Sequence, residues 1–334
     1  MEKKFKFSIC IPTYNGAKYI RDCLKSISNQ SYQNFEIIIS DDCSTDDTVK
    51  VVKSYKDQRI RIYRTPRNLG YGDNLKTFNS KFSGEIMFMM AQDDLLTPDA
   101  LFKVAQAYEL DDDVGAVIRP YYQFDHDPKI PVRHAPPPDV NKDLLVSIFD
   151  DKKIIERIIE ASGLLSALSY RVKFMDTDFH KDVFPAHAYP FFSIFKKHKI
   201  VFLHDYIVAV RIFSSQARFK SSIYEPSPVE TWVKMFNTVL KEKQYNQVRE
   251  NCIDYAARNY VGLVQIRNYS SYKNLLKEIL VLLKYRWINI LNLRFWFYCI
   301  ICLLTPRLFL VKIVDEYKKR ILSGIIRSEV EIRL

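Results

Sequence analysis

Short apolar runs alternate with amphipathic stretches over the first 120 residues of the chain. Apolar runs of this length predict buried strands, and the amphipathic stretches between them predict helices. The predicted strands cover residues 5–12, 35–40, 60–64, 85–91 and 114–120, and the predicted helices cover residues 17–30, 46–57, 71–82 and 98–110. Because strands that alternate with helices form right-handed βαβ units, the pattern predicts an α/β fold with a mainly parallel sheet flanked by helices.

The pattern changes after the last of these strands. Residues 121–141 include five prolines and predict an irregular connection. Helical periodicity returns over residues 142–161, and a mixed stretch over residues 176–215 ends in two β-like runs. The remainder of the chain has helical periodicity only. We therefore expect an α/β domain over residues 1–220 and a helical region over residues 221–334.

Charge divides the chain in the same sense. Residues 1–150 carry 20 Lys and Arg against 22 Asp and Glu, a net charge of −2. Residues 151–334 carry 30 against 17, a net charge of +13, which together with the first half gives the +11 of the whole chain. The basic half is therefore expected to have a different role from the first half. Nucleic-acid binding is not expected, because its aromatic residues lie in apolar helical runs and form no nucleic-acid recognition motif.

The end of the chain is basic and apolar at once. Residues 273–334 carry 12 basic and 5 acidic residues, the balance expected of a surface that meets anionic lipid. The uncharged run over residues 295–306, bracketed by Arg294 and Arg307, is shorter than the roughly 20 residues that a spanning helix needs. An interfacial or re-entrant helix is therefore predicted. The alternative is a helical subdomain whose apolar face packs on the α/β core.

Cysteine usage and the N-terminus point to a reducing environment. The six cysteines have no paired framework, so we expect them reduced and the protein facing the cytosol. Cys299 and Cys302 have CxxC spacing but no second pair of ligands, so neither a zinc nor a redox site is expected. The first residues enter a predicted strand without a long apolar leader, and no secretory signal is expected.

Two pairs of carboxylates are the candidate chemistry. Asp41 and Asp42 follow the second predicted strand, and Asp93 and Asp94 follow the fourth. The carboxyl ends of parallel strands are where α/β sheets bind ligands. Like charges packed so closely require a cation or hydrogen-bond donors, which indicates a Mg²⁺ or Mn²⁺ site shared with a diphosphate.

Helix capping is the alternative explanation of these acidic segments. Ser44 or Asp46 would cap the helix after the first pair, and Thr97 or Asp99 the helix after the second. Capping does not require the carboxylates that precede the caps, so we expect those carboxylates to contact a nucleotide.

At this point four ordered segments resemble the family 2 glycosyltransferases, which have the Rossmann-like GT-A fold. The segments are SICIPTYNG (8–16), SDDCSTDDT (40–48), RNLGYGDN (67–74) and SGEIMFMMAQDDLLTPDAL (83–101). The close resemblance covers roughly residues 6–110, and a looser one extends to about residue 215. It implies a nucleotide-binding half over residues 1–120 and an acceptor half over residues 142–220 of one catalytic domain.

The resemblance also implies roles for residues after the first two strands. Pro12, Thr13 and Tyr14 form the turn that would receive a nucleobase. Asp41 would accept the imide N–H of the base, which fits a pyrimidine, with Asp42 beside it.

A loop before a helix holds Asn68 and Gly70, where close backbone approach and the helix N-terminus suit a phosphate.

In the second acidic motif, the resemblance implies that Asp94 ligates the metal and that Asp93 contacts the ribose or donor sugar. Gln92 stands where the family often has an acid, which lowers the local charge. Arg211, after a β-like run, matches an arginine that family members place near the donor diphosphate, and a guanidinium binds phosphate well.

An inverting transferase needs a general base to take the proton of the acceptor hydroxyl. The Glu-Asp pair that usually supplies it is absent from residues 181–200. His187 stands near its position, with an ordinary pKa of about 6.5, and Asp182 is the nearest carboxylate. Both remain candidates.

The predicted function is therefore the metal-dependent, inverting transfer of a sugar from a nucleotide-diphosphate sugar to a hydroxyl of a lipid-linked glycan. By resemblance, the setting is surface polysaccharide biosynthesis of the O-antigen or capsule type, with the enzyme peripheral to the cytoplasmic face of the cell membrane. The alternatives are an inactive transferase-like scaffold and a basic membrane-binding module. A dinucleotide-dependent oxidoreductase is excluded because no GxGxxG follows a predicted strand.

Overall fold

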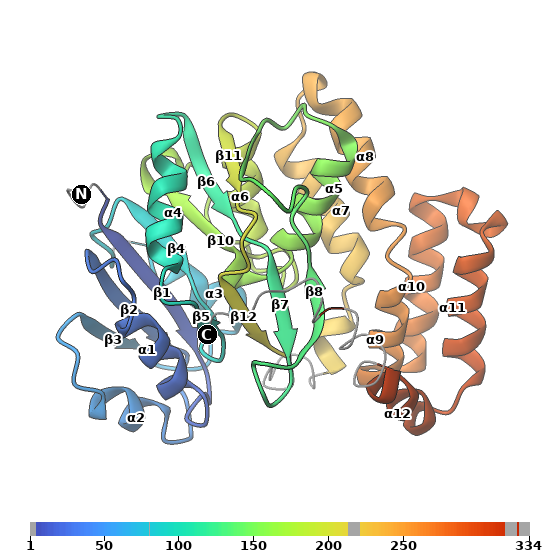
Figure 1. Cartoon of the computed structure of the whole chain (residues 1–334). Coiled ribbons are helices and arrows are strands. Elements are labelled where there is room, and N and C mark those ends of the chain that lie inside the picture. The colour runs from blue at the N-terminus through green and yellow to red at the C-terminus, as the bar shows by residue number, and fades with distance from the viewer. Residues whose placement is uncertain (1–4, 80, 213–220, 318–325, 327–334) are drawn as a thin grey trace. The chain divides into compact units, whose positions relative to one another are not determined.

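The computed structural model describes residues 5–79, 81–212, 221–317 and 326 (Figure 1). The described chain separates into two compact units. The first contains the residues up to Ile212 together with Ile326, and the second lies between Phe213 and Ile325.

An eight-stranded sheet organises the first unit, in the order β3-β2-β1-β4-β10-β6-β11-β9. The pairs β3–β2, β2–β1, β1–β4 and β6–β11 are parallel, whereas β10 runs antiparallel to both of its neighbours and β9 antiparallel to β11. This mixed, mainly parallel sheet confirms the predicted α/β fold. Its strands are β1 (Phe7–Thr13), β2 (Phe35–Asp41), β3 (Ile60–Arg64), β4 (Ile86–Met89), β6 (Val114–Ile118), β9 (Leu144–Val146), β10 (Leu168–Arg171) and β11 (Lys199–Phe202).

A second, four-stranded sheet has the order β5-β12-β7-β8. Its strands are β5 (Leu95–Leu96), β12 (Val208–Arg211), β7 (Tyr121–Phe124) and β8 (Pro131–Ala135). The prediction of an irregular connection over residues 121–141 was therefore wrong, because β7 and β8 pair antiparallel there. Pro131 opens an edge strand, where a missing N–H removes no ladder bond from the sheet.

The predicted helix over residues 142–161 was wrong in its first half. Residues Leu144–Val146 form β9 at the edge of the large sheet, and the helix α5 runs only from Lys152 to Ser162. Asp151 begins this helix by accepting a hydrogen bond from the N–H of Lys153 at 2.8 Å. Strand pairing with β11 and this cap override the helical periodicity of the preceding residues.

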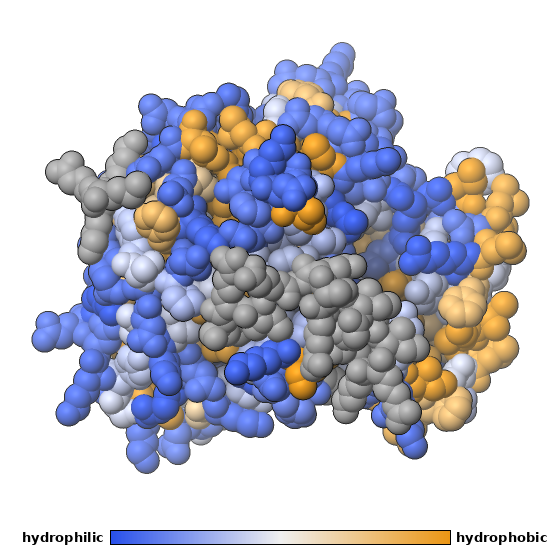
Figure 2. All heavy atoms as spheres, in the orientation of Figure 1, coloured by the Kyte–Doolittle hydropathy of each residue, from blue (hydrophilic) through white to orange (hydrophobic). Residues whose placement is uncertain are grey.

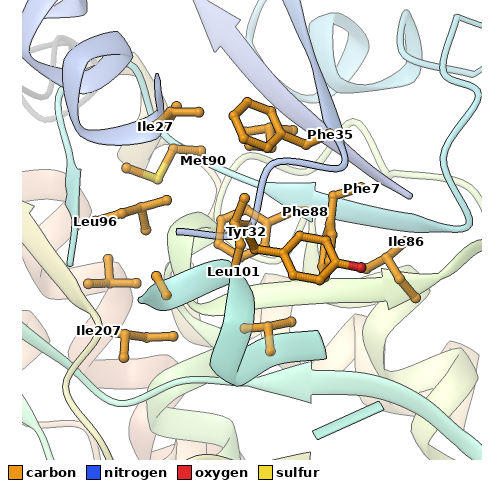
Figure 3. Packing of buried hydrophobic residues seen from close by; sticks show 14 of the residues in the cluster. Phe7, Ile27, Tyr32, Phe35, Ile86, Phe88, Met90, Leu96, Leu101 and Ile207 are labelled. Carbon is orange, nitrogen blue, oxygen red and sulfur yellow. The ribbon is translucent and has the colours of Figure 1, made fainter. Parts of the chain in front are cut away.

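The four helices among the first strands follow them as predicted, whereas the helix α6 (Ala188–Phe195) lies in the stretch that was predicted only as mixed. Buried residues of α1 recur at spacings of three and four, at Ile20, Cys23, Leu24 and Ile27, which turns one face to the core. Figure 3 shows side chains of β1, β4, α1 and α4 meeting in this core. The helices are α1 (Ile20–Ser28), α2 (Thr48–Ser54), α3 (Tyr71–Lys76), α4 (Ala100–Glu109) and α6 (Ala188–Phe195).

The second unit is helical throughout its described residues, which confirms the helical C-terminal region. Ser227, Ser271 and Asn292 cap its helices α7, α10 and α11 through their side-chain oxygens. Between residues 221 and 317, and in the first unit's described part, no helix has the length and apolarity to cross a membrane. The helices are α7 (Pro228–Val239), α8 (Asn246–Ala256), α9 (Val261–Tyr269), α10 (Tyr272–Tyr285), α11 (Leu293–Leu304) and α12 (Arg307–Tyr317).

Candidate functional site

Three neighbouring parallel strands end at one edge of the large sheet. The central strand β1 pairs with β2 up to the register Thr13–Asp41, and with β4 up to Cys10–Met89. The segments that follow β1, β2 and β4 therefore emerge together. The strand ends and these segments hold the predicted residues Pro12, Thr13, Tyr14, Asp41, Asp42, Asp93 and Asp94. The prediction of a turn over residues 12–14 was wrong for its first two residues, because Pro12 and Thr13 pair with β2 as part of β1.

Asp41 is buried and fixes the turn after β2. Its carboxylate accepts the N–H of Ser44 at 3.1 Å, the Ser44 hydroxyl, and the Thr13 hydroxyl at 3.4 Å. The guanidinium of Arg64 lies 3.4 Å away. Ser44 thus bonds Asp41 instead of capping α2, and the predicted contact of Asp41 with a nucleobase would use a lone pair that these donors leave open.

Asp42 ties a second loop to the end of β2. Its two oxygens accept the N–H groups of Leu69 at 2.7 Å and Gly70 at 2.9 Å, and the Thr65 hydroxyl lies 3.2 Å away. The amide of Asn68 donates to the Asp42 carbonyl at 3.4 Å. Gly70 has a φ of 85°, which other residues adopt only with strain. The Gly70 N–H, which was predicted to suit a phosphate, therefore already donates a hydrogen bond to Asp42 when no phosphate is bound.

Gln92 holds the turn after β1. Its amide oxygen accepts the N–H of Tyr14 and its amide nitrogen donates to the Tyr14 carbonyl, both at 3.1 Å. A Cβ on Gly16 would lie 2.1 Å from this amide oxygen, so a larger residue there would displace the Gln92 side chain from this position. An acid at this position has no N–H to donate to Tyr14. Gln92, which departs from the family's acidic motif, therefore makes two hydrogen bonds to Tyr14 that the sequence did not predict.

Asn15 was also missed. It adopts the left-handed conformation, with a φ of 48°, and its side-chain oxygen accepts the N–H of Thr45 at 2.8 Å. Its own N–H donates to the Ser44 hydroxyl at 2.9 Å. Asn15 thereby joins the turn after β1 to the turn after β2. An Asn immediately before Gly is a common signal for a turn, and could have singled it out.

Asp94 is the most deeply placed carboxylate of the second pair. It accepts the Ser166 hydroxyl at 2.6 Å and the backbone N–H of Arg211 at 3.0 Å. Burial, with the neighbouring charge of Asp93, raises the pKa of the Asp94 carboxyl well above its ordinary value. Ser166 also accepts the N–H of Ala91 at 2.8 Å, so its hydroxyl bonds both ends of the segment Ala91–Asp94. The sequence did not single out this serine.

Arg211 lies beside this pair, while its predicted contact with the donor diphosphate stays a prediction. Its Nε donates to the carbonyl of Asp93 at 3.4 Å. Its guanidinium lies over the rings of Tyr19 and Phe124, with centroids 4.9 and 4.6 Å away. The structure therefore brings a cation to the edge of the sheet where the two acidic pairs emerge.

Comparison with known proteins identifies the family of the chain. The family model described as glycosyl transferase family 2 matches residues 8–197. The chain belongs to glycosyl transferase family 2. An uncharacterized glycosyltransferase of Haemophilus influenzae is 35% identical over 112 residues, which are 33% of this chain and 35% of that protein. The family 2 chain thus spans about a third of the length of this curated relative.

Two solved structures share the fold of the family 2 chain. Staphylococcus aureus TarS 1–349 in complex with UDP has a TM-score of 0.62 at 17% identity, covering 98% of this chain and 93% of that one. The mannosyltransferase PcManGT of Pyrobaculum calidifontis, in complex with GDP-Man and Mn²⁺, has a TM-score of 0.53 at 16% identity and covers 91% and 87%. At these identities the likeness shows the fold alone.

The donor atoms of the second pair suit a hard divalent ion. Among the described residues, no three His, Cys, Asp or Glu side chains cluster as metal ligands. Asp93 and Asp94 are, however, adjacent in the sequence and carry oxygen donors. Burial and the charge of Asp93 keep the pKa of Asp94 raised despite its hydrogen bonds from Ser166 and Arg211, so its negative charge is only partly compensated. Mg²⁺ and Mn²⁺ prefer such oxygens and complete their coordination with water and phosphate. The residues of the family 2 chain therefore fit the predicted ion.

His187 is buried and takes part in a network of hydrogen bonds. Its Nε2 donates to the Ser162 carbonyl at 3.1 Å, and its Nδ1 accepts the Tyr71 hydroxyl at 2.9 Å. The Tyr170 hydroxyl donates to the His187 carbonyl at 2.8 Å. Burial lowers the pKa of His187 to about 4. Both ring nitrogens are engaged, so this histidine is poorly suited to accept a proton from a substrate.

Asp182, the other candidate base, is half-buried. Its carboxylate lies 3.1 Å from Nδ1 of His180, whose ring stacks on Tyr189. The segment meets the start of α3, because a Cβ on Gly72 would lie 2.3 Å from the His180 carbonyl. The loop that carries Gly70 and the segment that carries Asp182 are therefore in contact, while the choice of base stays a prediction.

Proposed function

We propose that this family 2 chain transfers a sugar, with inversion, from a nucleotide-diphosphate sugar to a hydroxyl group of a glycan. The observation that carries the proposal is the meeting of two carboxylate pairs and Arg211 at the ends of neighbouring parallel strands. Such an edge is where α/β sheets bind nucleotides.

A pyrimidine nucleotide is the donor class that we infer. Asp41 lies at the end of β2, next to the end of β1 at Pro12 and Thr13 and to the turn at Tyr14 that Gln92 bonds. A carboxylate there would accept the imide N–H of the base while the turn receives its ring. The crystal structure of TarS with UDP supports uridine diphosphate as the first nucleotide to test.

The diphosphate would lie between Asp94 and Arg211. A divalent ion held by Asp94, with Asp93 toward the ribose or donor sugar, would stabilise the departing diphosphate as a Lewis acid. The chain's own contribution is to orient Asp94 through Ser166 and the Arg211 N–H, and to place the Arg211 guanidinium beside the Asp93 carbonyl. Asn68 and Gly70 would flank the phosphates through the loop that Asp42 holds.

We favour Asp182 over His187 as the general base. Asp182 keeps part of its side chain open to solvent, whereas His187 is buried with both nitrogens bonded. The Asp182 carboxylate would accept the proton of the acceptor hydroxyl as that oxygen attacks the anomeric carbon. His187 would instead position Tyr71 at the start of α3.

A lipid-linked glycan is the acceptor that we propose, met at the cytoplasmic face of the cell membrane in surface polysaccharide biosynthesis of the O-antigen or capsule type. Support comes from the basic, apolar character of residues 273–334. A catalytically inactive scaffold is the second candidate, because the family's usual Glu-Asp pair is absent.

Calorimetric titration with UDP, GDP, dTDP and CDP, each with Mn²⁺ and then with EDTA, tests the donor site. We expect selective binding of UDP that weakens with EDTA and in Asp94→Ala, but not in Asp47→Ala, an exposed carboxylate near the same edge. Binding of none of the four nucleotides would overturn the proposal and favour the scaffold.

Hydrolysis or transfer assays of Asp182→Asn and His187→Gln test the base. We expect Asp182→Asn to lose turnover with its nucleotide affinity retained. His187→Gln should keep turnover and change the pH dependence of stability, because the depressed pKa makes the native state lose stability as pH falls from about 6.5 to about 4. Loss of turnover in His187→Gln alone would reverse the assignment.

A further inference from the structure

Helix α11 in the second unit is apolar on two opposite faces. One face, which carries Phe295, Cys299 and Cys302, is buried within the unit. The other face carries Leu293, Trp296, Phe297, Ile300 and Leu304, all of them exposed. Their spacing of three and four residues places them on one side of the helix. A soluble helix normally turns polar residues to the side opposite its buried face, so this outer face requires an explanation.

The exposed face extends beyond α11. Trp287 and Leu291, in the turn before the helix, are each 73% exposed, and Leu308 of α12 is 86% exposed. Figure 2 shows the apolar residues gathered over α11, the helix at the far right of Figure 1. We call this set the apolar face, and it consists of Trp287, Leu291, Leu293, Trp296, Phe297, Ile300, Leu304 and Leu308.

Three polar groups beside these apolar residues have hydrogen-bond partners within the unit. The indole N–H of Trp296 donates to the Ile290 carbonyl at 2.8 Å, so the exposed ring presents hydrocarbon to the outside. Arg267 bonds the carbonyls of Cys302 and Thr305, at 2.9 and 3.2 Å, and so closes the C-terminal end of α11. A medium without hydrogen-bond partners would therefore leave these groups unchanged.

Basic residues surround the apolar face. Arg294 and Arg307 flank α11 at its two ends, and Lys312 follows on α12, all of them exposed. Between residues 272 and 317 there are seven Lys and Arg against three Asp and Glu, of which Glu278 is buried. Aromatic and aliphatic side chains inside a basic rim complement an anionic lipid surface.

We propose that the apolar face inserts into the headgroup boundary of an anionic bilayer, with α11 lying in the plane of the surface. The helix has 12 residues, fewer than the roughly 20 that cross a bilayer, so it fits the interface and not the hydrocarbon core. In a symmetric dimer through this face, the basic rims of two copies would meet each other, which is unfavourable. Lipid is therefore the occupant to which we commit.

Flotation of the full chain with vesicles tests the proposal. Vesicles of phosphatidylcholine with about 30% phosphatidylglycerol should carry the protein to the top of the gradient, and those of phosphatidylcholine alone should carry much less. The triple variant Leu293→Ser/Phe297→Ser/Ile300→Ser should lower the bound fraction by about tenfold. Leu110→Ser/Val140→Ser/Phe149→Ser, which replaces three exposed apolar residues of the first unit, is the matched control and should bind as the unchanged chain does.

The basic rim has its own variant, Arg294→Gln/Arg307→Gln/Lys312→Gln, which should weaken binding to anionic vesicles and reduce its salt dependence. Lys25→Gln/Lys50→Gln/Lys53→Gln removes the same charge from exposed sites of the first unit and should have no such effect. Circular dichroism and thermal unfolding would verify that each variant folds.

Three results would overturn the proposal. They are no flotation with either vesicle, equal flotation of the triple variant and the unchanged chain, or a dimer by light scattering that the triple variant abolishes. Because the readout is lipid binding, its failure would leave nucleotide binding and the proposed transferase function intact, and the reverse also holds.

Discussion

The two carboxylate pairs lie at the same edge of one sheet but in opposite electrostatic conditions. Asp41 and Asp42 are surrounded by donors, namely three backbone N–H groups and three hydroxyls within 3.4 Å. Asp94 has one hydroxyl and one N–H, has Asp93 beside it, and its pKa is raised by burial. The first pair is compensated by the protein, whereas the second leaves a demand for positive charge that a divalent ion with a diphosphate would meet.

This difference indicates a structural role for the first pair, in addition to the proposed contact of Asp41 with the base, and a chemical role for the second. Removal of a carboxylate from the first pair should cost stability, because buried or half-buried N–H groups lose their acceptors. Removal of a charge from the second pair should lower activity. It should also stabilise the protein in the absence of the ion, because a buried charge is lost. Four experiments address this contrast.

The largest expected effect is on catalysis at the second pair. Asp94→Ala should lower the rate of transfer from the donor by about a hundredfold to a thousandfold, because the site loses the buried carboxylate that is proposed to hold the ion. Steady-state assays with UDP-sugars and Mn²⁺ measure it, with Asp47→Ala as the control. Full activity in Asp94→Ala would remove the distinction between the pairs.

The next effect is on stability at the first pair. Asp42→Ala should lower the free energy of unfolding by about 2 kcal/mol, since the N–H groups of Leu69 and Gly70 lose their acceptor. Urea unfolding measures the change. Asp42→Asn keeps one acceptor oxygen, so its free energy of unfolding should lie between those of the unchanged chain and Asp42→Ala. An unchanged free energy of unfolding in Asp42→Ala would show that water replaces the carboxylate at this loop.

The Gln92 bridge comes third. Gln92→Glu should lower the free energy of unfolding by about 1.5 kcal/mol, because a carboxylate oxygen would face the Tyr14 carbonyl in place of an N–H. The exposed Gln106→Glu adds the same charge on α4 and should change stability little. If instead the Glu variant binds Mn²⁺ more tightly without loss of stability, the bridge is dispensable and the second pair accepts a third acid.

The smallest effect has the opposite sign. Asp94→Asn should raise the free energy of unfolding by about 1 kcal/mol at pH 7 in EDTA, because it removes a buried charge. With a raised native pKa, Asp94 holds its proton longer when folded, so the unchanged chain loses stability as pH rises above the ordinary value of 3.8, and the Asn variant does not. Urea unfolding between pH 4 and pH 8 measures it, and a difference that does not vary with pH would contradict the assignment to the charge of Asp94.

Much of the first unit could be predicted from local patterns. The alternation of apolar runs and amphipathic helices gave the strands β1, β2, β3, β4 and β6 in order, and parallel strands necessarily bring their carboxyl ends together. The strands β7, β8 and β9 were missed. Prolines obscured β8, and β9 carries a helical pattern, so in both cases a partner distant in the sequence decided the conformation.

The candidate site, too, could be predicted only in part. Its acidic residues and Arg211 could be named from motifs, but the partners that define their chemistry could not. Ser166 is 72 residues from Asp94, and Gln92 is 78 residues from Tyr14. His187 was a candidate base from its position in the sequence, but its hydrogen bonds with Tyr71 and Tyr170 appear only in the structure. No local signal reports such contacts.

The sequence by itself determined the α/β alternation, the family motifs, the helical basic region, and the adjacency of the carboxylates within each pair. Those properties follow from periodicity and composition, which act over a few neighbouring residues. The tertiary structure alone decided which carboxylates find donors, how far burial raises the pKa of Asp94 and lowers that of His187, and which face of α11 remains uncovered. Desolvation and hydrogen bonding depend on groups brought together from distant positions, and so they appear only in the folded chain.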